Sequence, residues 1–211
     1  MRFTLVYRED LDDFRPLADQ MFSDRRRQFI ERLGWSLDAD TKGRELDAYD
    51  AENPLYLIAT DEEGNHLGST RLMPTTAPTM INEVFTDLLG GVAITSATTW
   101  ECTRFVVSAS ANRRVAPAIM WAGCALALRS GVDRYVSVTG TNLIRVFKAS
   151  GWEPEIMGRS ESEEGEICAC LWEVSEEQCE KLRRRARIPE GTPAPRIHLR
   201  EPVAHQSAVA A

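Results

Sequence analysis

The chain has 211 residues, of which 43% are hydrophobic and 27% are charged, and its formal net charge is -7. This length suits one large domain with a substantial core. The acidic balance argues against a general nucleic-acid-binding protein, which carries a basic surplus. No stretch approaches the roughly 20 apolar residues of a membrane span, and the N-terminus becomes charged too early for a secretory signal. We therefore expect a cytoplasmic protein that binds neither nucleic acid nor membrane.

The cysteines do not predict a metal centre or a disulfide framework. They are odd in number and lie in apolar or amphipathic segments, which favours buried free thiols. Cys168 and Cys170 are the only close pair, and alternation along a strand places both on one face. No His or Cys cluster completes a set of metal ligands. We therefore expect no bound metal.

The first third of the chain predicts a strand, a helix and a hairpin. The strand covers residues 3–7, and apolar residues near a period of 3.6 predict a helix over residues 12–33. Residues 35–54 are polar and predict a loop. The apolar runs 55–60 and 66–73 are separated by turn-forming residues, which is typical of a β-hairpin.

The rest of the chain alternates between strands and helices. The predicted elements are a short helix at 80–89, a strand at 100–107, a helix at 116–128, a strand at 134–138, a helix at 142–149, strands at 153–158 and 167–174, and a helix at 176–186. From residue 188 onward, Pro and Ala with few apolar anchors predict a loosely held tail. The order predicts an α+β domain over residues 1–187, with a central mixed sheet flanked by helices, and a tail at 188–211.

Several charged residues occur where the pattern is otherwise apolar. Arg71 lies inside an apolar strand, and Glu101 and Arg104 lie inside the strand at 100–107. Burying such a charge without a partner costs several kcal/mol. Taken singly, each is explained by an ion pair that only stabilises the fold. Arg25 and the acidic run of Glu45, Asp47 and Asp50 add to this set from two further segments, and the combination favours a functional site.

The order and spacing of these residues resemble those of the LuxI-type acyl-homoserine lactone synthases. The match runs through Arg25-x-x-x-Phe29-x-x-x-x-x-Trp35, Glu45-x-Asp47-x-x-Asp50, Gly68-Ser69-Thr70-Arg71-Leu72-x-Pro74, Phe85 and Trp100-Glu101-x-x-Arg104-Phe105. Val138-Thr139 and residues 148–152 resemble the second half of that family, so the similarity extends to about residue 175.

The resemblance implies a fold similar to the GNAT N-acyltransferases. It also implies S-adenosylmethionine as co-substrate, no permanently bound cofactor, and acyl-acyl-carrier protein or acyl-CoA as acyl donor. The products are the acyl-homoserine lactone, methylthioadenosine and the released thiol carrier. The GNAT loop that binds the acyl-CoA pyrophosphate is rich in Gly, whereas residues 109–114 of this chain are not. This difference favours acyl-carrier protein as the donor without deciding between the two carriers.

The resemblance assigns roles to the charged residues. An α-amine with a pKa near ~8 is largely protonated at neutral pH, so a neighbouring carboxylate must remove its proton. Glu101 is the expected base, and Arg71 and Arg104 complete the catalytic set by holding the substrate carboxylate or the acids. The expected binding residues for S-adenosylmethionine are Arg25, Phe29, Trp35, Glu45, Asp47, Asp50 and Phe105.

The acyl chain requires an apolar pocket, although most apolar helix residues are simply core. The candidates are Thr139, Met80, Phe85, Trp121, Leu143 and Phe147, with Ala125 and Val138 as further ones. A Thr at the position of Thr139 accompanies 3-oxo acyl substrates in the family, and an ordinary strand Thr is the alternative. Basic candidates for docking an acidic carrier protein are Arg113, Arg114, Arg145 and Lys148, with a solvated helix face as the alternative.

Two other functions remain compatible with the composition. One is a GNAT-type N-acyltransferase that acts on another amine, which needs neither Trp35 nor the acids at 45–50. The other is a small-molecule sensor that has lost turnover. The complete charged set, with both Glu101 and Arg104 present, argues against the sensor.

Overall fold

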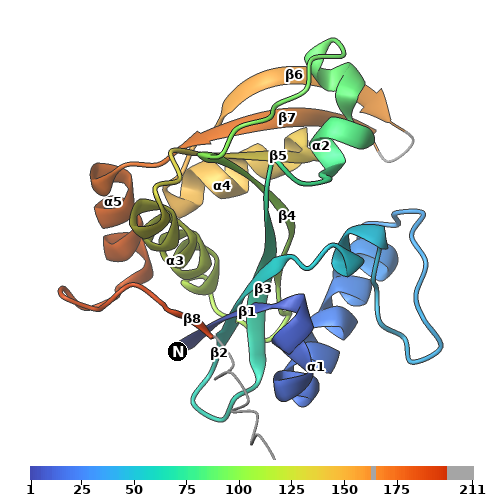
Figure 1. Cartoon of the computed structure of the whole chain (residues 1–211). Helices are drawn as coiled ribbons and strands as arrows, with labels where there is room; N and C mark the ends of the chain where they lie inside the picture. Colours follow the sequence, from blue (N-terminus) through green and yellow to red (C-terminus); the bar gives the residue numbers. More distant parts are fainter. Residues whose placement is uncertain (163–164, 199–211) are drawn as a thin grey trace, which may run out of the picture.

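The computed structural model describes residues 1–162 and 165–198. Its centre is an eight-stranded sheet with the strand order β6-β7-β5-β4-β3-β2-β1-β8, in which parallel and antiparallel pairs are mixed. Figure 1 shows α1 against one side of the sheet and α3, α4 and α5 against the other. The predicted α+β class with a central mixed sheet is confirmed.

The N-terminal elements match the predicted order. They are β1 (Arg2–Tyr7), a 3-10 helix (Arg8–Phe14), α1 (Arg15–Arg26), a π-helical turn (Arg27–Arg32), a 3-10 helix (Ala48–Ala51), β2 (Leu55–Thr60) and β3 (His66–Pro74). The single helix expected at 12–33 is therefore three helical segments of different type. The hairpin of β2 and β3 is confirmed, with Leu55 opposite Leu72.

The later elements differ from the prediction mainly at their ends. They are α2 (Met80–Glu83), a 3-10 helix (Thr86–Leu89), β4 (Thr99–Val107), α3 (Val115–Ser130), β5 (Arg134–Gly140), a 3-10 turn (Thr141–Leu143), α4 (Ile144–Ser150), β6 (Glu155–Ser162), β7 (Gly165–Glu173), α5 (Glu176–Ala186) and β8 (Ile197–His198). The helix expected at 80–89 is interrupted between its two parts. The strand β8, which pairs in parallel with β1, lies in the predicted tail and was not expected. Residues 199–211 of that tail lie outside the described part.

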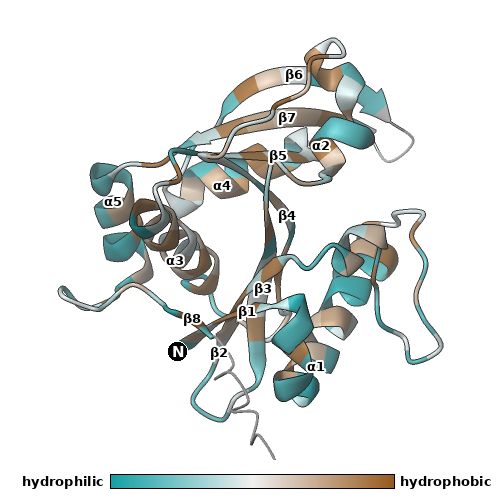
Figure 2. Ribbon diagram, in the orientation of Figure 1, coloured by the Kyte–Doolittle hydropathy of each residue, from teal (hydrophilic) through white to brown (hydrophobic). Residues whose placement is uncertain are grey.

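The largest hydrophobic cluster lies between the sheet and the helices α3, α4 and α5. Almost every residue of α3 from Val115 to Ala127 is buried, and Figure 2 shows hydrophilic colouring concentrated on α5 instead. A second cluster packs α1 against β1 and β2, and a third packs α2 against β5 and β7. Within residues 1–162 and 165–198, no helix has the length and apolar character that a membrane span requires.

The strands β4 and β5 pair only at their first residues. Their parallel register runs from Thr99 opposite Arg134 to Glu101 opposite Val136 and then ends. On its other side β4 pairs with β3, with a register shift between Ser69 and Arg71. The two central strands therefore separate beyond Glu101 and leave space between them.

The segment that contains α2 packs against the outer strand β6 at one glycine. A Cβ atom at Gly158 would overlap the backbone carbonyl of Leu88. Only a residue without a side chain allows the two backbones to approach this closely. Gly158 therefore fixes how near the segment lies to the sheet.

Candidate active site

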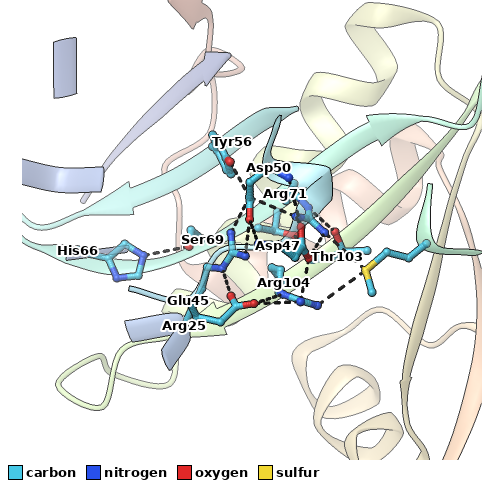
Figure 3. A network of polar contacts seen from close by, with 12 residues as sticks. Arg25, Glu45, Asp47, Asp50, Tyr56, His66, Ser69, Arg71, Thr103 and Arg104 are labelled. Atoms are coloured by element: carbon cyan, nitrogen blue, oxygen red, sulfur yellow. Dashed lines mark hydrogen bonds and ion pairs between the residues drawn. The ribbon is translucent and has the colours of Figure 1, made fainter. Parts of the chain in front are cut away.

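A continuous network of ion pairs joins α1, the loop at 35–54, β3 and β4 (Figure 3). Arg25, on α1, donates from Nε to Glu45 Oε2 at 2.6 Å and from its two terminal nitrogens to the two oxygens of Asp50 at 2.9 Å each. All three side chains are at most 2% exposed. Because buried charges of this kind need paired partners, Arg25 holds the loop against α1.

The acidic loop is also ordered by its own turn. Asp47 accepts a hydrogen bond from the backbone N–H of Asp50, and Asp50 accepts one from the backbone N–H of Asp47, which makes a capping box on the 3-10 helix. Tyr56 Oη donates to Asp50 Oδ1 at 2.6 Å. The three-residue spacing between Asp47 and Asp50 is therefore the spacing that this capping box requires.

Arg71 extends the network to the sheet. Both of its terminal nitrogens pair with the carboxylate of Asp47, and Nη1 lies 3.2 Å from Asp50 Oδ1. Its Nε donates to Thr103 Oγ1 at 3.0 Å. The side chain is fully buried, so every polar end of this guanidinium is committed to protein groups.

Arg104 differs from the other two arginines because one nitrogen is uncommitted, in the sense that no oxygen of the described residues accepts from it. Its Nε donates to Glu45 Oε1 at 3.1 Å, and Nη2 lies 3.0 Å from that oxygen and 2.8 Å from Asp47 Oδ2. Among the described residues, Nη1 contacts only Met80 Sδ at 3.8 Å. The backbone of Arg104 has a φ of 52°, a left-handed conformation that is uncommon within a strand. This conformation sets the direction in which the guanidinium leaves β4.

The ion pairs and burial shift the pKa values of the network residues by different amounts and for different reasons. Burial alone would raise the pKa of the Asp50 carboxyl, but Arg25 and Arg71 outweigh burial and hold that pKa well below its ordinary value. Burial lowers the pKa of Arg104, and Glu45 only partly opposes that effect. Three arginines and three acidic side chains cancel in formal charge.

Glu101 adds one negative charge beside this balanced network. It is buried on β4, and its carboxylate accepts the backbone N–H of Ile81 at 2.6 Å and that of Met80 at 3.1 Å. Burial raises the pKa of Glu101, and the two amides and Arg71 only partly offset the rise. A carboxylate with a raised pKa binds a proton more tightly than an ordinary one. Two hydrogen bonds therefore fix the direction of the Glu101 carboxylate, and burial makes it more basic than an ordinary carboxylate.

A cavity of about 390 Å³ lies beside the network, between the separated parts of β4 and β5. Phe29 and Trp35 form part of its wall as a stacked pair, with ring centroids 4.9 Å apart and an interplanar angle of 18°. The guanidinium of Arg104 lies 5.6 Å from the centroid of the Phe29 ring. The aromatic pair and the uncommitted nitrogen thus belong to one end of the cavity.

Most of the predicted site residues belong to one of two groups in the structure. Eleven of them line the cavity, namely Phe29, Trp35, Met80, Phe85, Glu101, Arg104, Phe105, Val138, Thr139, Leu143 and Phe147. The charged residues Arg25, Glu45, Asp47, Asp50 and Arg71 form the layer behind it. Direct substrate contact by Arg25, Glu45 and Asp50 is not supported, because they are sealed within the network. Of the three acidic residues in the network, Asp47 has the most accessible side chain, which is 18% exposed.

Trp121 does not belong to the cavity wall. It lies on α3 and packs against Phe3 of β1, with ring centroids 5.8 Å apart. The neighbouring turns of α3 line the cavity instead, through Ala116, Ile119, Met120 and Gly123. The expectation for Trp121 is wrong because α3 is buried all round, so its apolar pattern does not reveal which side faces the cavity.

The sequence did not reveal the aromatic wall at the other end of the cavity. Tyr135, Trp152 and Trp172 line it together with Ser137. Alternation along β5 was a usable signal, because Tyr135, Ser137 and Thr139 share one face. Among the described residues, no group of three or more His, Cys, Asp and Glu residues is arranged to hold a metal ion.

Comparison with known proteins gives a consistent result. The model of the autoinducer synthase family matches residues 11–182. A curated acyl-homoserine-lactone synthase of Rhizobium etli is 36% identical over 186 residues, which cover 85% of this chain and 87% of the relative.

Solved structures give the same picture. The structure of MesI, described as a CoA-dependent acyl-homoserine lactone synthase, is 31% identical with a TM-score of 0.78, covering 89% of this chain and 96% of that one. TofI, solved in a ternary complex with an inhibitor and MTA, is 28% identical with a TM-score of 0.68, covering 83% and 91%. An N-acetyltransferase from Lactobacillus plantarum, at 11% identity, a TM-score of 0.56 and coverage of 83% and 100%, is similar in fold alone. The GNAT-like fold is therefore confirmed.

Proposed function

This chain belongs to the autoinducer synthase family and is an acyl-homoserine-lactone synthase, and from that premise we propose which of its residues carry out the reaction. The reaction transfers the acyl group of a thioester to the amine of S-adenosylmethionine, and the substrate carboxylate then displaces methylthioadenosine to close the lactone. The site therefore needs a base for the amine, a partner for the carboxylate and a surface for the sulfonium.

Glu101 is the proposed base. The observation that carries this assignment is a buried carboxylate at the cavity wall, with a raised pKa and two backbone amides that fix its direction. A carboxylate has about four acceptor positions, so two remain for the substrate ammonium. The base takes one proton from the ammonium, and the neutral nitrogen attacks the thioester carbon. The carbon–sulfur bond then breaks as the nitrogen loses a second proton, which the leaving sulfur takes up to give the thiol.

Arg104 is the proposed partner of the substrate carboxylate. Its Nη1 is the uncommitted donor described above, and the residue lines the cavity. Arg25 and Arg71 are positioning residues, because their guanidinium groups are occupied by Asp50, Glu45 and Asp47. A charge-assisted hydrogen bond from Arg104 would orient the carboxylate oxygen toward the γ carbon that it attacks.

The sulfonium and adenosine are proposed to bind near Phe29 and Trp35. A cation over an aromatic face gains about 0.5–2 kcal/mol, and the stacked pair offers such a face at the cavity wall. The balanced network and Glu101 together carry one net negative charge, whereas zwitterionic S-adenosylmethionine carries one net positive charge. Asp47, the most accessible acid, is the proposed source of this local attraction.

Acyl-CoA is the proposed acyl donor. The similarity to MesI, whose description names CoA dependence, supports this choice. Arg113 and Arg114 are exposed directly before the 16-residue helix α3, whose residue Ala116 lines the cavity. Basic side chains at a helix N-terminus suit a phosphate group, which supports Arg113 and Arg114 as the proposed partners of the CoA phosphates. Thr139 lines the cavity, and its proposed contact with a 3-oxo group stays a prediction.

The test is a comparison of donors with two products measured together. Purified protein is given S-adenosylmethionine and hexanoyl-CoA, or hexanoyl-acyl-carrier protein, and both methylthioadenosine and free thiol are quantified. We expect equimolar release and a kcat/KM about tenfold or more higher with hexanoyl-CoA. Thiol without methylthioadenosine would indicate a plain acyltransferase, and a higher kcat/KM with the carrier protein would contradict the proposed donor. Arg113→Glu should raise the KM for hexanoyl-CoA but not that for S-adenosylmethionine.

A further inference from the structure

A hydroxyl group lies in the aromatic wall of the cavity and belongs to neither the base nor the ion-pair network. Ser137 is 8% exposed and lines the cavity, and Trp172 Nε1 donates to its Oγ at 3.0 Å. An indole N–H can only donate, so Ser137 is the acceptor in this bond. Among the described residues, no acceptor receives the hydroxyl proton of Ser137.

The three aromatic residues described in this wall have their polar side-chain atoms paired with protein groups. Tyr135 Oη donates to the carbonyl of Gly123 at 3.0 Å, and Trp152 Nε1 donates to the carbonyl of Glu173 at 3.1 Å. The Trp172 ring is held edge to face by Phe147 at 4.9 Å and by Trp152 at 5.6 Å. The aromatic residues therefore present apolar rings to the cavity, and Ser137 is a single oriented donor among them.

Ser137 and the proposed base point to opposite faces of the sheet. It is the first residue of β5 beyond the last pair with β4, which joins Val136 to Glu101. Consecutive residues of a strand point to opposite faces. Ser137 points to the face that carries Trp172 and α4, whereas the Glu101 carboxylate is bound by the amides of α2. An acyl oxygen that accepts from Ser137 is therefore bound on the opposite face of the sheet from the Glu101 carboxylate.

We propose that Ser137, oriented by Trp172, is a specificity-determining residue that selects acyl groups with a hydroxyl or carbonyl oxygen on the distal part of the chain. The inference rests on the proposed function and deepens it by naming the class of acyl group. Buried donors are nearly always satisfied in proteins, and a pocket that holds one disfavours a ligand without an acceptor. Thr139 lies two residues further along β5, about 7 Å away, so the two hydroxyls contact different positions of the chain.

The experiment compares acyl groups of equal length. The intact enzyme is given S-adenosylmethionine with octanoyl-CoA or with its 5-, 6-, 7- or 8-hydroxy derivative, and methylthioadenosine release and the mass of the lactone are measured. At least one hydroxylated thioester should have a kcat/KM about 10- to 100-fold above that of octanoyl-CoA. No preference for any of them would overturn the inference. Absence of methylthioadenosine release with every thioester would overturn the proposed function, and the inference with it.

Variants identify the group responsible for the preference. Ser137→Ala should reduce the ratio of the two kcat/KM values to about one. Because Ser137→Ala leaves the Trp172 N–H unpaired, the double variant Ser137→Ala with Trp172→Phe removes both partners and should show the same ratio in a folded protein. Ser150→Ala is the matched control, since Ser150 donates within α4 to the carbonyl of Val146, and it should keep the preference. A preference that survives in the double variant would refute the role of Ser137.

Discussion

Replacement of Glu101 by Gln separates the chemical role of this residue from its structural one. The side chain is 1% exposed, and its carboxylate accepts two backbone N–H groups. Gln keeps one acceptor oxygen, but its amide nitrogen must face one of the two donors. Loss of one buried hydrogen bond costs about 1–3 kcal/mol, and removal of a buried negative charge offsets part of this. We therefore expect Tm to fall by no more than about 4–10 °C in a protein of this length.

The rate should change far more than the stability. Loss of a general base typically costs about 10²–10⁴ in rate, which corresponds to about 2.7–5.4 kcal/mol of activation free energy. The assay is methylthioadenosine release at saturating substrates from pH 6.5 to 9.5. The residual rate of Glu101→Gln should recover partly as pH rises, because more of the substrate amine is then unprotonated. Glu83→Gln is the matched control, since exposed Glu83 accepts from Tyr49 Oη and does not line the cavity.

Two results would refute this reasoning. A near-normal rate at pH 7 would remove Glu101 from the role of base, and a large loss that does not vary with pH would indicate a purely positional role. Stability gives an independent check. Since the pKa of Glu101 is raised in the folded state, its protonated form contributes stability below the unfolded pKa, and this is lost as pH rises through the folded pKa. The Tm advantage of the wild type over Glu101→Gln should therefore be largest in acid.

Three further perturbations test the network. Arg25→Met leaves Glu45 and Asp50 without their main cation and should cost about 3–5 kcal/mol in urea unfolding, whereas an unchanged midpoint would show that the pairs contribute nothing. Arg104→Lys keeps the charge but loses the forked donors, so the KM for S-adenosylmethionine should rise about tenfold or more, and an unchanged KM would reject the carboxylate contact. Because the pKa of Asp50 is held low, its stabilising effect is complete above its ordinary value of 3.8 and is lost as pH falls below it. Thermal melts from pH 2.5 to 5 should show this loss in the wild type and a smaller one in Arg25→Met.

Much of the fold follows from local patterns that the sequence displays. The hairpin of β2 and β3 is bounded by turn residues, and α5 begins at a Ser cap whose side chain accepts from Gln178 N–H. Local patterns do not predict where one helical segment ends and the next begins within residues 8–32 and 80–89, because 3-10, α and π segments share nearly the same apolar spacing. The strand β8 was also missed, since two residues carry no periodic signal and depend on β1 as a pairing partner.

The sequence indicated which residues are candidates for the site, but it did not indicate how their side chains are arranged. Charges inside apolar strands pointed to Arg71, Glu101 and Arg104, but spacing gives no information about which guanidinium is sealed and which faces a cavity. That distinction arises from long-range pairing, such as the contact of Arg104 with Glu45 across 59 positions. The role of Ser137 depends on Trp172 from a neighbouring strand, and no local pattern encodes that hydrogen bond.

The close approach at Gly158 links the outer strand of the sheet to the reaction. Gly158 admits the carbonyl of Leu88, and the same segment supplies the amides of Met80 and Ile81 that hold Glu101. A larger residue at 158 would push this segment outward and release the proposed base, Glu101, from its two anchors, although Gly158 itself does not line the cavity. The tolerance of this enzyme to mutation is thus limited by backbone clearance as well as by chemistry, and a survey restricted to the cavity wall would overlook this position.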